Sequence, residues 1–248
     1  MQDLKISLIT VVFNAENTIN RCIGSVISQD FRNIEYIIID GGSTDNTIQI
    51  IQENKQFISH FISEPDKGIY DAMNKGIQLA TGDVIGMLNA DDVFADHTVL
   101  STIANAFIQQ DSDITYGDLD YVNGNEKVIR KWRSGNFTSK NLNWGWMPPH
   151  PTFYCKRHLF KKFGLYSLNY GTAADYELML RFLYANNLRV SYIKKVLVKM
   201  KVGGKSNKNI ISRVKGLFYD LEAMRSNDIS LPVITLIVKP LRKINQYF

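Results

Sequence analysis

Apolar strand-like segments alternate with helical segments over the first part of the chain, and this alternation constrains the fold most strongly. Residues 6–13, 34–39, 57–63 and 84–88 are short apolar runs rich in β-branched residues, which is typical of strands. Apolar residues at helical spacing follow the first run: Ile19, Cys22, Ile23, Val26 and Ile27. Because parallel strands need crossover connections, the pattern predicts right-handed βαβ units around a mostly parallel sheet.

Acidic residues follow three of these predicted strands, at Asp40, Asp66 and the pair Asp91-Asp92. Any one of them is explained by a solvated turn, but the carboxyl ends of parallel strands meet at one edge of a sheet. Two carboxylates placed there are costly to leave unpaired, and they are ligands that Mg²⁺ or Mn²⁺ prefers. The sequence therefore predicts a cation at Asp91-Asp92. The alternative is that this pair caps a helix that begins near Thr98.

The second half of the chain predicts an antiparallel addition to the sheet. Residues 119–122 and 127–132 flank Asn123-Gly124, which is a strong hairpin signal. The other segments expected here are a strand at 113–117, an ordered loop with exposed aromatic rings at 141–152, helices at 157–163 and 171–184, a strand at 188–198 and a helix at 210–224.

Length and composition limit the class of protein. A chain of 248 residues with 45% hydrophobic and 21% charged residues is typical of one large globular domain, or of one domain with an appendage. Only two cysteines occur, and Cys22 lies on an apolar helical stripe, so we expect a reduced cytoplasmic protein. The sequence shows neither a signal peptide nor a run of about 18 apolar residues that spans a bilayer.

The net charge of +5 is compatible with three kinds of partner: nucleic acid, an anionic membrane surface or a phosphorylated substrate. The lysines are dispersed and no motif typical of nucleic-acid binding occurs. We therefore predict no nucleic-acid partner.

Four short motifs occur in a fixed order: Thr10–Asn14 (TVVFN), Ile39–Asp45 (IDGGSTD), Glu64–Gly76 (EPDKGIYDAMNKG) and Leu88–Asp92 (LNADD). In these motifs the chain resembles the inverting, family 2 nucleotide-sugar glycosyltransferases, and more narrowly the small bacterial members that build O-antigen, capsule or other surface polysaccharide. The resemblance continues with less force through residues 175–204.

The resemblance implies an α/β protein with the GT-A fold, a Rossmann-like and mostly parallel central sheet with helices on both faces. We expect this domain over residues 1–208, divided into a nucleotide-sugar-binding half at 1–112 and an acceptor-binding half at 113–208. An amphipathic, basic helical tail is expected at 209–248.

The resemblance also implies a donor site at the strand ends. Asp40 is expected to bond the base or ribose of the donor, and Asp66 the edge of the nucleobase, such as uracil N–H. Asp92, or Asp91 with it, is expected to hold the Mn²⁺ or Mg²⁺ that stabilises charge on the leaving diphosphate. Further donor-site residues are predicted at Val12, Asn14, Glu16, Lys67, Asn89 and Ala90. Asn89 departs from the aspartate more common in the family.

Inverting transfer needs a base that takes the proton of the acceptor hydroxyl. Asp175, at the start of a predicted helix, is the candidate, and Asp118 and Asp120 are the alternatives. Ala174 stands where the family often has a glutamate. His150 lies between two prolines and is predicted to contact the metal or the diphosphate, unless its role is structural.

Three further features each have two interpretations. Trp144 and Trp146 either stack on a sugar or pack their loop onto the sheet. Residues 201–208, with three lysines around two glycines, form either a basic lid over the diphosphate or a solvated loop. Residues 231–238, followed by basic residues, either lie on an anionic membrane surface or form a buried helix.

These observations predict a metal-dependent, inverting glycosyltransferase in bacterial surface polysaccharide biosynthesis. It moves a sugar from a nucleotide-diphosphate donor, a UDP-sugar, to a hydroxyl of a glycan or lipid-linked glycan. We expect it in the cytoplasm, at the inner face of the membrane if the C-terminal tail lies on the bilayer surface. A non-catalytic homologue that binds nucleotide or glycan is one alternative. A sugar-1-phosphate nucleotidyltransferase is another, but Asn14-Ala15-Glu16-Asn17 is not the Gly-rich basic phosphate loop that it needs.

Overall fold

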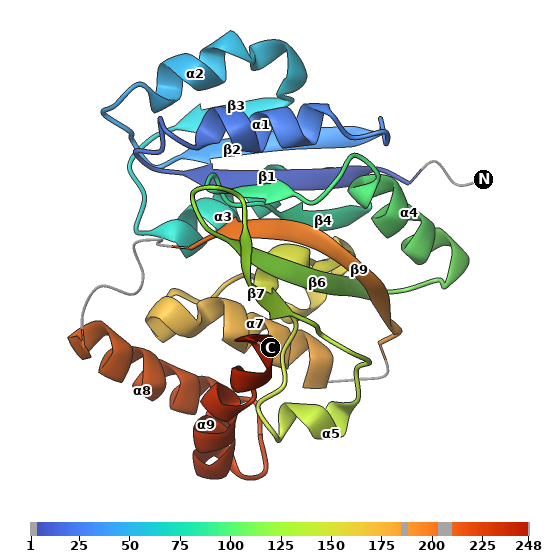
Figure 1. The fold of residues 1–248 in the computed structure, drawn as a ribbon, viewed down its shortest axis with the longest axis vertical. Helices are drawn as coiled ribbons and strands as arrows, with labels where there is room; N and C mark the ends of the chain where they lie inside the picture. The colour runs from blue at the N-terminus through green and yellow to red at the C-terminus, as the bar shows by residue number, and fades with distance from the viewer. Residues whose placement is uncertain (1–3, 185–187, 203–209, 248) are drawn as a thin grey trace.

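The computed structural model describes residues 4–184, 188–202 and 210–247, which fold around one nine-stranded sheet (Figure 1). The strand order is β3-β2-β1-β4-β8-β6-β9-β5, and β7 pairs with β6. The strands are β1 (Ile6–Val12), β2 (Ile34–Asp40), β3 (His60–Ser63), β4 (Val84–Met87), β5 (Asp92–Phe94), β6 (Ile114–Val122), β7 (Val128–Trp132), β8 (Tyr154–Lys156) and β9 (Val190–Lys201).

The predicted parallel half of the sheet is confirmed. Strand β1 pairs in parallel with β2 and β4, and β2 pairs in parallel with β3. Every residue of β1 is buried, because successive side chains enter two different apolar clusters: Ile9 and Val11 join one, and Leu8 and Val12 join the other. Both faces of these strands are therefore covered, which explains their continuous apolar sequence.

Helices supply the other side of each cluster. Helices α1 (Ile19–Ile27) and α4 (Val99–Gln109) pack on one face, and α3 (Ile69–Leu79) packs on the other. The connections α2 (Thr47–Glu53) and the 3₁₀ turn η1 (Lys55–Phe57) complete the first half. The predicted layers of a sheet with helices on both faces are thus confirmed.

The second half adds antiparallel strands, as expected, but β6 and β9 pair in parallel, which was not expected. Strands β6 and β7 form the predicted hairpin, and β5 pairs antiparallel with β9. Strand β6 is continuous through Gly117, although the sequence analysis expected two separate segments there. Register shifts near Gly117 keep β6 paired with β9. The three-residue strand β8 was not predicted and bridges β4 and β6.

The remaining helices cover the lower part of the molecule in Figure 1. They are α5 (Ser139–Leu142), α6 (His158–Phe163), α7 (Ala174–Tyr184), α8 (Ile210–Ser226) and α9 (Pro232–Leu241), with 3₁₀ turns η2 (His150–Thr152), η3 (Leu168–Ala173) and η5 (Ile244–Tyr247). Ala223 and Met224 of α8 are fully buried in the same cluster as Phe182 of α7. The C-terminal tail (residues 210–247) therefore packs into the core of the main domain.

One expectation for the 141–152 loop is wrong. The ring of Trp146 is only 5% exposed, and its Nε1 donates a hydrogen bond to the carbonyl oxygen of Ser134 at 2.7 Å. Trp144 is half exposed. The Trp146 ring can be buried because its N–H group has a hydrogen-bond acceptor inside the fold.

Two expectations concern the end of the chain. Most of the predicted basic lid, residues 203–208, lies outside the described residues. Within the described part of the chain, no helix combines the length and apolarity needed to cross a membrane.

Candidate active site

The loops that follow β1 and β2 are tied together by side chains predicted to bind the donor. Asn14 adopts a left-handed conformation (φ 49°), its amide donates to Ser43 Oγ at 2.8 Å, and its Oδ1 accepts from the Thr44 amide at 2.8 Å. The Glu16 carboxylate accepts from the amide of Asn46 at 3.1 Å, and Val12 is buried. These side chains hold the two loops in place, and their expected contacts with the donor stay predictions.

Asp40 shapes its own loop. Its side chain is 0% exposed, and Oδ2 accepts from the Ser43 amide at 2.9 Å and from Ser63 Oγ at 2.7 Å. Oδ2 also accepts from the Gly42 amide, and Oδ1 accepts from Ser43 Oγ. Four protein donors thus bond the buried Asp40 carboxylate, which supports a role in shaping the loop, and its expected contact with the donor stays a prediction.

The Asp66 side chain, which follows β3, is accessible to solvent near the end of β2. Its carboxylate is partly exposed, and Oδ1 accepts from the Gly68 amide at 2.8 Å. A Cβ atom built on Gly41 would lie well under 3.0 Å from Asp66 Oδ2. The missing side chain of Gly41 thus makes room for the Asp66 carboxylate. Lys67 is exposed, and its amide bonds to Asp71.

The adjacent acids Asp91 and Asp92 lie in opposite environments. Asp91 is exposed, whereas Asp92 is 0% exposed and accepts from Asn89 Nδ2 at 3.3 Å. Burial and the nearby charge of Asp91 raise the pKa of Asp92 well above its usual value, which favours the neutral acid. Asp92 Oδ1 is buried without a hydrogen-bond partner among the described residues, so the predicted role of Asp92 as a metal ligand stays a prediction, and Asp91 is the more accessible of the two acids.

The alternative that this acid pair caps the next helix is also wrong. Helix α4 has Thr98 at its N-cap, and the Thr98 amide bonds to Asp96 Oδ1 at 2.9 Å. Neither Asp91 nor Asp92 takes part in that cap.

The residues around Asp91 fit a divalent cation shared with a substrate. Asn89 Oδ1 is buried without a hydrogen-bond partner, and Ala90 is buried beside it. Among the described residues, no three His, Cys, Asp or Glu side chains form a ready ligand cluster. Mg²⁺ is commonly bound by one or two carboxylates together with substrate phosphates and water. The arrangement matches that mode and does not form an all-protein cage.

Asp175 lies in the first turn of α7 and is half-buried. Tyr70 and Tyr166 stack beside it, with ring centroids 5.5 Å apart. Burial and the charge of Asp175 raise the pKa of Tyr70, so this hydroxyl stays protonated. The sequence analysis missed both tyrosines, although Tyr70 lies within the Glu64–Gly76 motif.

His150 belongs to the Asp175 cluster. Its Nε2 lies 2.7 Å from the hydroxyl of Tyr166, and burial lowers the pKa of His150, against the opposing charge of Asp175. A neutral imidazole held by Tyr166 supports a positioning role. In the described part of the chain no cluster of ligand residues surrounds it, so its predicted metal contact gains no support.

The alternative bases are already engaged. Asp118 is buried and accepts from the Ser134 amide at 2.9 Å and from the Tyr192 hydroxyl at 2.8 Å. Asp120 pairs with Arg133 at 2.7 Å. Asp175 is thus the more accessible of the candidate bases.

The sheet as a whole is mixed, with four parallel and four antiparallel pairings, so the expectation of a mostly parallel sheet holds only for its first half. Accessible acids at the carboxyl ends of the parallel strands, with an acid at a later helix start, fit a GT-A nucleotide-sugar transferase. The family model "Glycosyl transferase family 2" matches residues 7–168. The chain belongs to this family of glycosyltransferases.

Similar proteins agree with this assignment. A PGL/p-HBAD biosynthesis glycosyltransferase of Mycobacterium bovis is 32% identical over 209 residues, which are 81% of this chain and 78% of that protein. The crystal structure of S. aureus TarS has a TM-score of 0.70 at 19% identity and covers 90% of this chain and 39% of that one. The mannosyltransferase PcManGT from Pyrobaculum calidifontis, in complex with GDP-Man and Mn²⁺, has a TM-score of 0.65 at 16% identity and covers 95% and 69%.

Proposed function

We propose that the protein transfers a sugar, with inversion, from a UDP-sugar to a hydroxyl of a glycan or lipid-linked glycan, using a divalent cation at Asp91. One observation carries the proposal. Asp66 and Asp91 are accessible acids that follow the parallel strands β3 and β4, so both lie at the carboxyl edge of the sheet. Ligands bind at this edge in open α/β sheets.

Each acid has a separate task in the proposed donor site. Asp66 accepts a hydrogen bond from the N–H edge of the base, because its Oδ2 bonds no protein donor among the described residues. Asp91 would hold Mn²⁺ or Mg²⁺, and Asn89 Oδ1, which is buried without a hydrogen-bond partner among the described residues, would accept from a donor hydroxyl. The bound cation neutralises the charge that grows on the leaving diphosphate.

Asp175 is proposed as the base. Its carboxylate accepts the proton of the acceptor hydroxyl as the hydroxyl oxygen attacks the anomeric carbon from the face opposite the diphosphate. Tyr70 and Tyr166 flank it and limit its access to water. Inversion of an α-linked donor gives a β-linked product.

The similar proteins support the donor class and the setting. TarS 1–349 was solved in complex with UDP-GlcNAc and has a TM-score of 0.64 at 15% identity. The M. bovis relative is named for PGL/p-HBAD biosynthesis, which favours assembly of a surface glycolipid or polysaccharide. Both uracil and guanine carry an N–H that suits Asp66, so the choice of UDP depends on this likeness.

We also propose that the C-terminal tail rests on the inner face of the membrane. Val233, Ile237 and Leu241 of α9 are each more than half exposed, and Arg242 follows them. An exposed apolar face beside cations suits an anionic bilayer surface. We expect sedimentation with anionic but not neutral vesicles, and loss of sedimentation in Ile237→Asp. Equal recovery of that variant with the vesicles would contradict the proposal.

The donor site is tested by a screen of UDP-, GDP-, dTDP- and CMP-sugars with Mn²⁺, Mg²⁺ or EDTA. A ligand of the folded state raises the melting temperature, and slow hydrolysis releases the nucleotide. We expect a metal-dependent shift with UDP-sugars that is lost in Asp91→Asn. The matched control is Asp83→Asn, which changes an exposed acid at the opposite end of β4. A shift that persists in EDTA without turnover would favour the non-catalytic alternative.

A further inference from the structure

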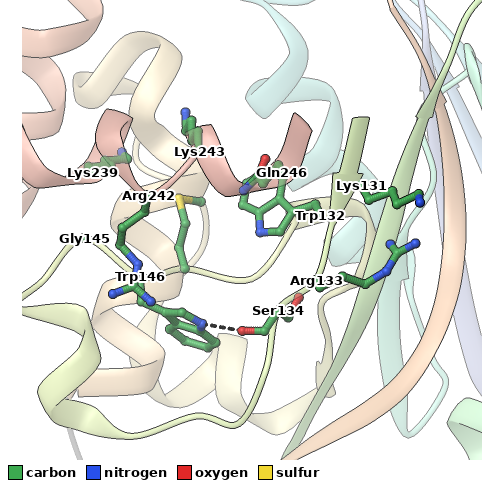
Figure 2. A pocket seen from close by; sticks show the side chains of 11 residues that line it. Lys131, Trp132, Arg133, Ser134, Gly145, Trp146, Lys239, Arg242, Lys243 and Gln246 are labelled. Atoms are coloured by element: carbon green, nitrogen blue, oxygen red, sulfur yellow. Dashed lines mark hydrogen bonds between the residues drawn. The ribbon is translucent and has the colours of Figure 1, made fainter. Parts of the chain in front are cut away.

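A cavity of about 440 Å³ lies outside the donor site, between β7 and the C-terminal tail (Figure 2). Its walls come from residues 131–134, 145–147 and the end of the tail. Trp132 and Trp146 supply aromatic surface, and Lys239, Arg242 and Lys243 line the tail side. Three segments that are distant in sequence thus enclose one space.

The walls of this cavity are fixed by specific contacts. Thr235 Oγ1 donates to the carbonyl oxygen of Asn143 at 2.6 Å, and Arg130 Nε donates to Gln246 Oε1 at 2.7 Å. A Cβ atom on Gly145 would lie 2.8 Å from the Cα of Lys239, so this glycine lets α9 approach closely. These contacts therefore hold the tail in a fixed position at both ends of the cavity.

The cavity is strongly basic. Five of its lining residues are Lys or Arg, and none is Asp or Glu. Lys239 pairs with Asp220 at 2.8 Å, and Arg133 pairs with Asp120 at 2.7 Å. No ion pair within the described residues neutralises the other three, which are Lys131, Arg242 and Lys243. Burial, together with the positive charges of Lys239 and Arg130, lowers the pKa of Lys243, against the opposing charges of Asp220 and Asp175.

One lining residue of the cavity, Lys239, contacts helix α7, which carries the proposed base. Lys239 Nζ lies 3.4 Å from the ring centroid of Tyr176, the residue after Asp175. The charge of Asp175 also acts on both Lys239 and Lys243. A group bound in the cavity is thus within electrostatic range of Asp175.

We propose that this basic cavity binds a phosphoryl group of the acceptor and so places the acceptor hydroxyl beside Asp175. Arg242 and Lys243, which no ion pair within the described residues neutralises, suit a multiply charged oxyanion better than a single carboxylate. The aromatic walls suit the sugar or hydrocarbon attached to the phosphate. The phosphoryl group comes from one of two sources, a lipid-linked diphosphate or a phosphate ester within a polymer. The inference rests on the proposed transferase function, because it assigns this group to the acceptor.

Tryptophan fluorescence tests the site, because two of the three tryptophans in the chain line the cavity. The full chain is titrated in EDTA with farnesyl diphosphate and, separately, with glycerol 3-phosphate. We expect a saturable change that weakens about tenfold or more in the double variant Arg242→Gln/Lys243→Gln, since tenfold corresponds to about 1.4 kcal/mol. The charge-matched control is Lys161→Gln/Lys162→Gln, two exposed lysines on α6, and it should bind as the wild type does.

The outcomes separate the two proposals. Tighter binding of farnesyl diphosphate supports a lipid-linked acceptor, and equal binding supports a phosphate ester. Unchanged affinity in the double variant, displacement of the phosphates by UDP, or no binding to the wild type overturns the cavity site. UDP binding with Mn²⁺ is measured on the same samples and should survive the double substitution. Its absence from the wild type would refute the donor site alone.

Discussion

Gly41→Ala is a small change with a large expected effect on donor binding. The added Cβ atom would lie well under 3.0 Å from Asp66 Oδ2, so the Asp66 carboxylate has to move. That carboxylate is the end of a flexible side chain, and Gly41 is not among the residues with positive φ. The substitution should therefore displace Asp66 at little cost in stability.

The magnitude follows from the contact that is lost. A hydrogen bond to a charged group contributes about 1.5–3 kcal/mol. Loss of the bond between Asp66 and the base should thus weaken UDP binding by about 10- to 150-fold, at about 1.4 kcal/mol per factor of ten. Replacing glycine by alanine at a compatible position changes unfolding stability by only about 0.4–1 kcal/mol.

Isothermal titration of UDP in the presence of Mn²⁺, together with thermal unfolding, measures both quantities. Gly24→Ala is the matched control, because a Cβ atom there meets nothing within 4 Å, and it should bind UDP normally. Asp66→Asn should reproduce the defect, and the two changes combined should add little. If Gly41→Ala kept its UDP affinity within about twofold, Asp66 would not be the base-binding residue.

Three further predictions concern single acids. Asp175→Asn should lower kcat by about 10²–10⁴-fold and leave UDP affinity unchanged, as measured by turnover and calorimetry; a parallel loss of affinity would contradict its role as base. The raised pKa of Asp92 means that the wild-type fold loses stability as the pH rises above about 4 and this buried group is forced to ionise. Asp92→Asn cannot ionise, so its melting temperature should rise relative to that of the wild type from about pH 4 upward, with UDP binding retained. Burial opposes ionisation of Glu35, but hydrogen bonds from Ser7, Thr81 and Lys5 prevail and lower its pKa from 4.5 to about 2. This depressed pKa stabilises the fold by about 3 kcal/mol above pH 5, which is lost as the pH falls toward 2. In denaturant unfolding, Glu35→Gln should be destabilised near pH 7 and approach wild type near pH 2, and a constant difference between the two proteins would refute this.

The sequence predicts the parallel half of the fold well. Strands buried on both faces leave long apolar runs such as residues 34–39, and Asn123-Gly124 marks the hairpin locally. Each of these patterns is formed by residues that are close together in the sequence. The family assignment also depended on such local motifs.

The exact roles of the acids were harder to predict, because a motif marks a strand end but not the direction of each side chain. Asp91 lies in a turn in which the Asp92 amide bonds to the Asn89 carbonyl oxygen, and Asp92 begins β5, so the two side chains have different surroundings. The burial of Asp40 depends on Ser63, which lies 23 residues away, and no local pattern reveals that contact.

The second half depends on contacts between distant segments. Strand β8 has only three residues, too few for a periodic pattern, and the pairing of Trp146 with Ser134 depends on the path of the loop. The cavity beside β7 needs the tail to return across the domain. The sequence therefore predicts that the tail is basic, but it does not reveal that these cations line one cavity.

A crystal structure with UDP and Mn²⁺, in which the Mn²⁺ is located by anomalous scattering, tests the donor site most directly. We predict Mn²⁺ bound by the Asp91 carboxylate and the diphosphate, with Asp92 buried as it is now and the uracil N–H on Asp66. Mn²⁺ held by Asp92 or His150, or uracil bound away from Asp66, would contradict the account.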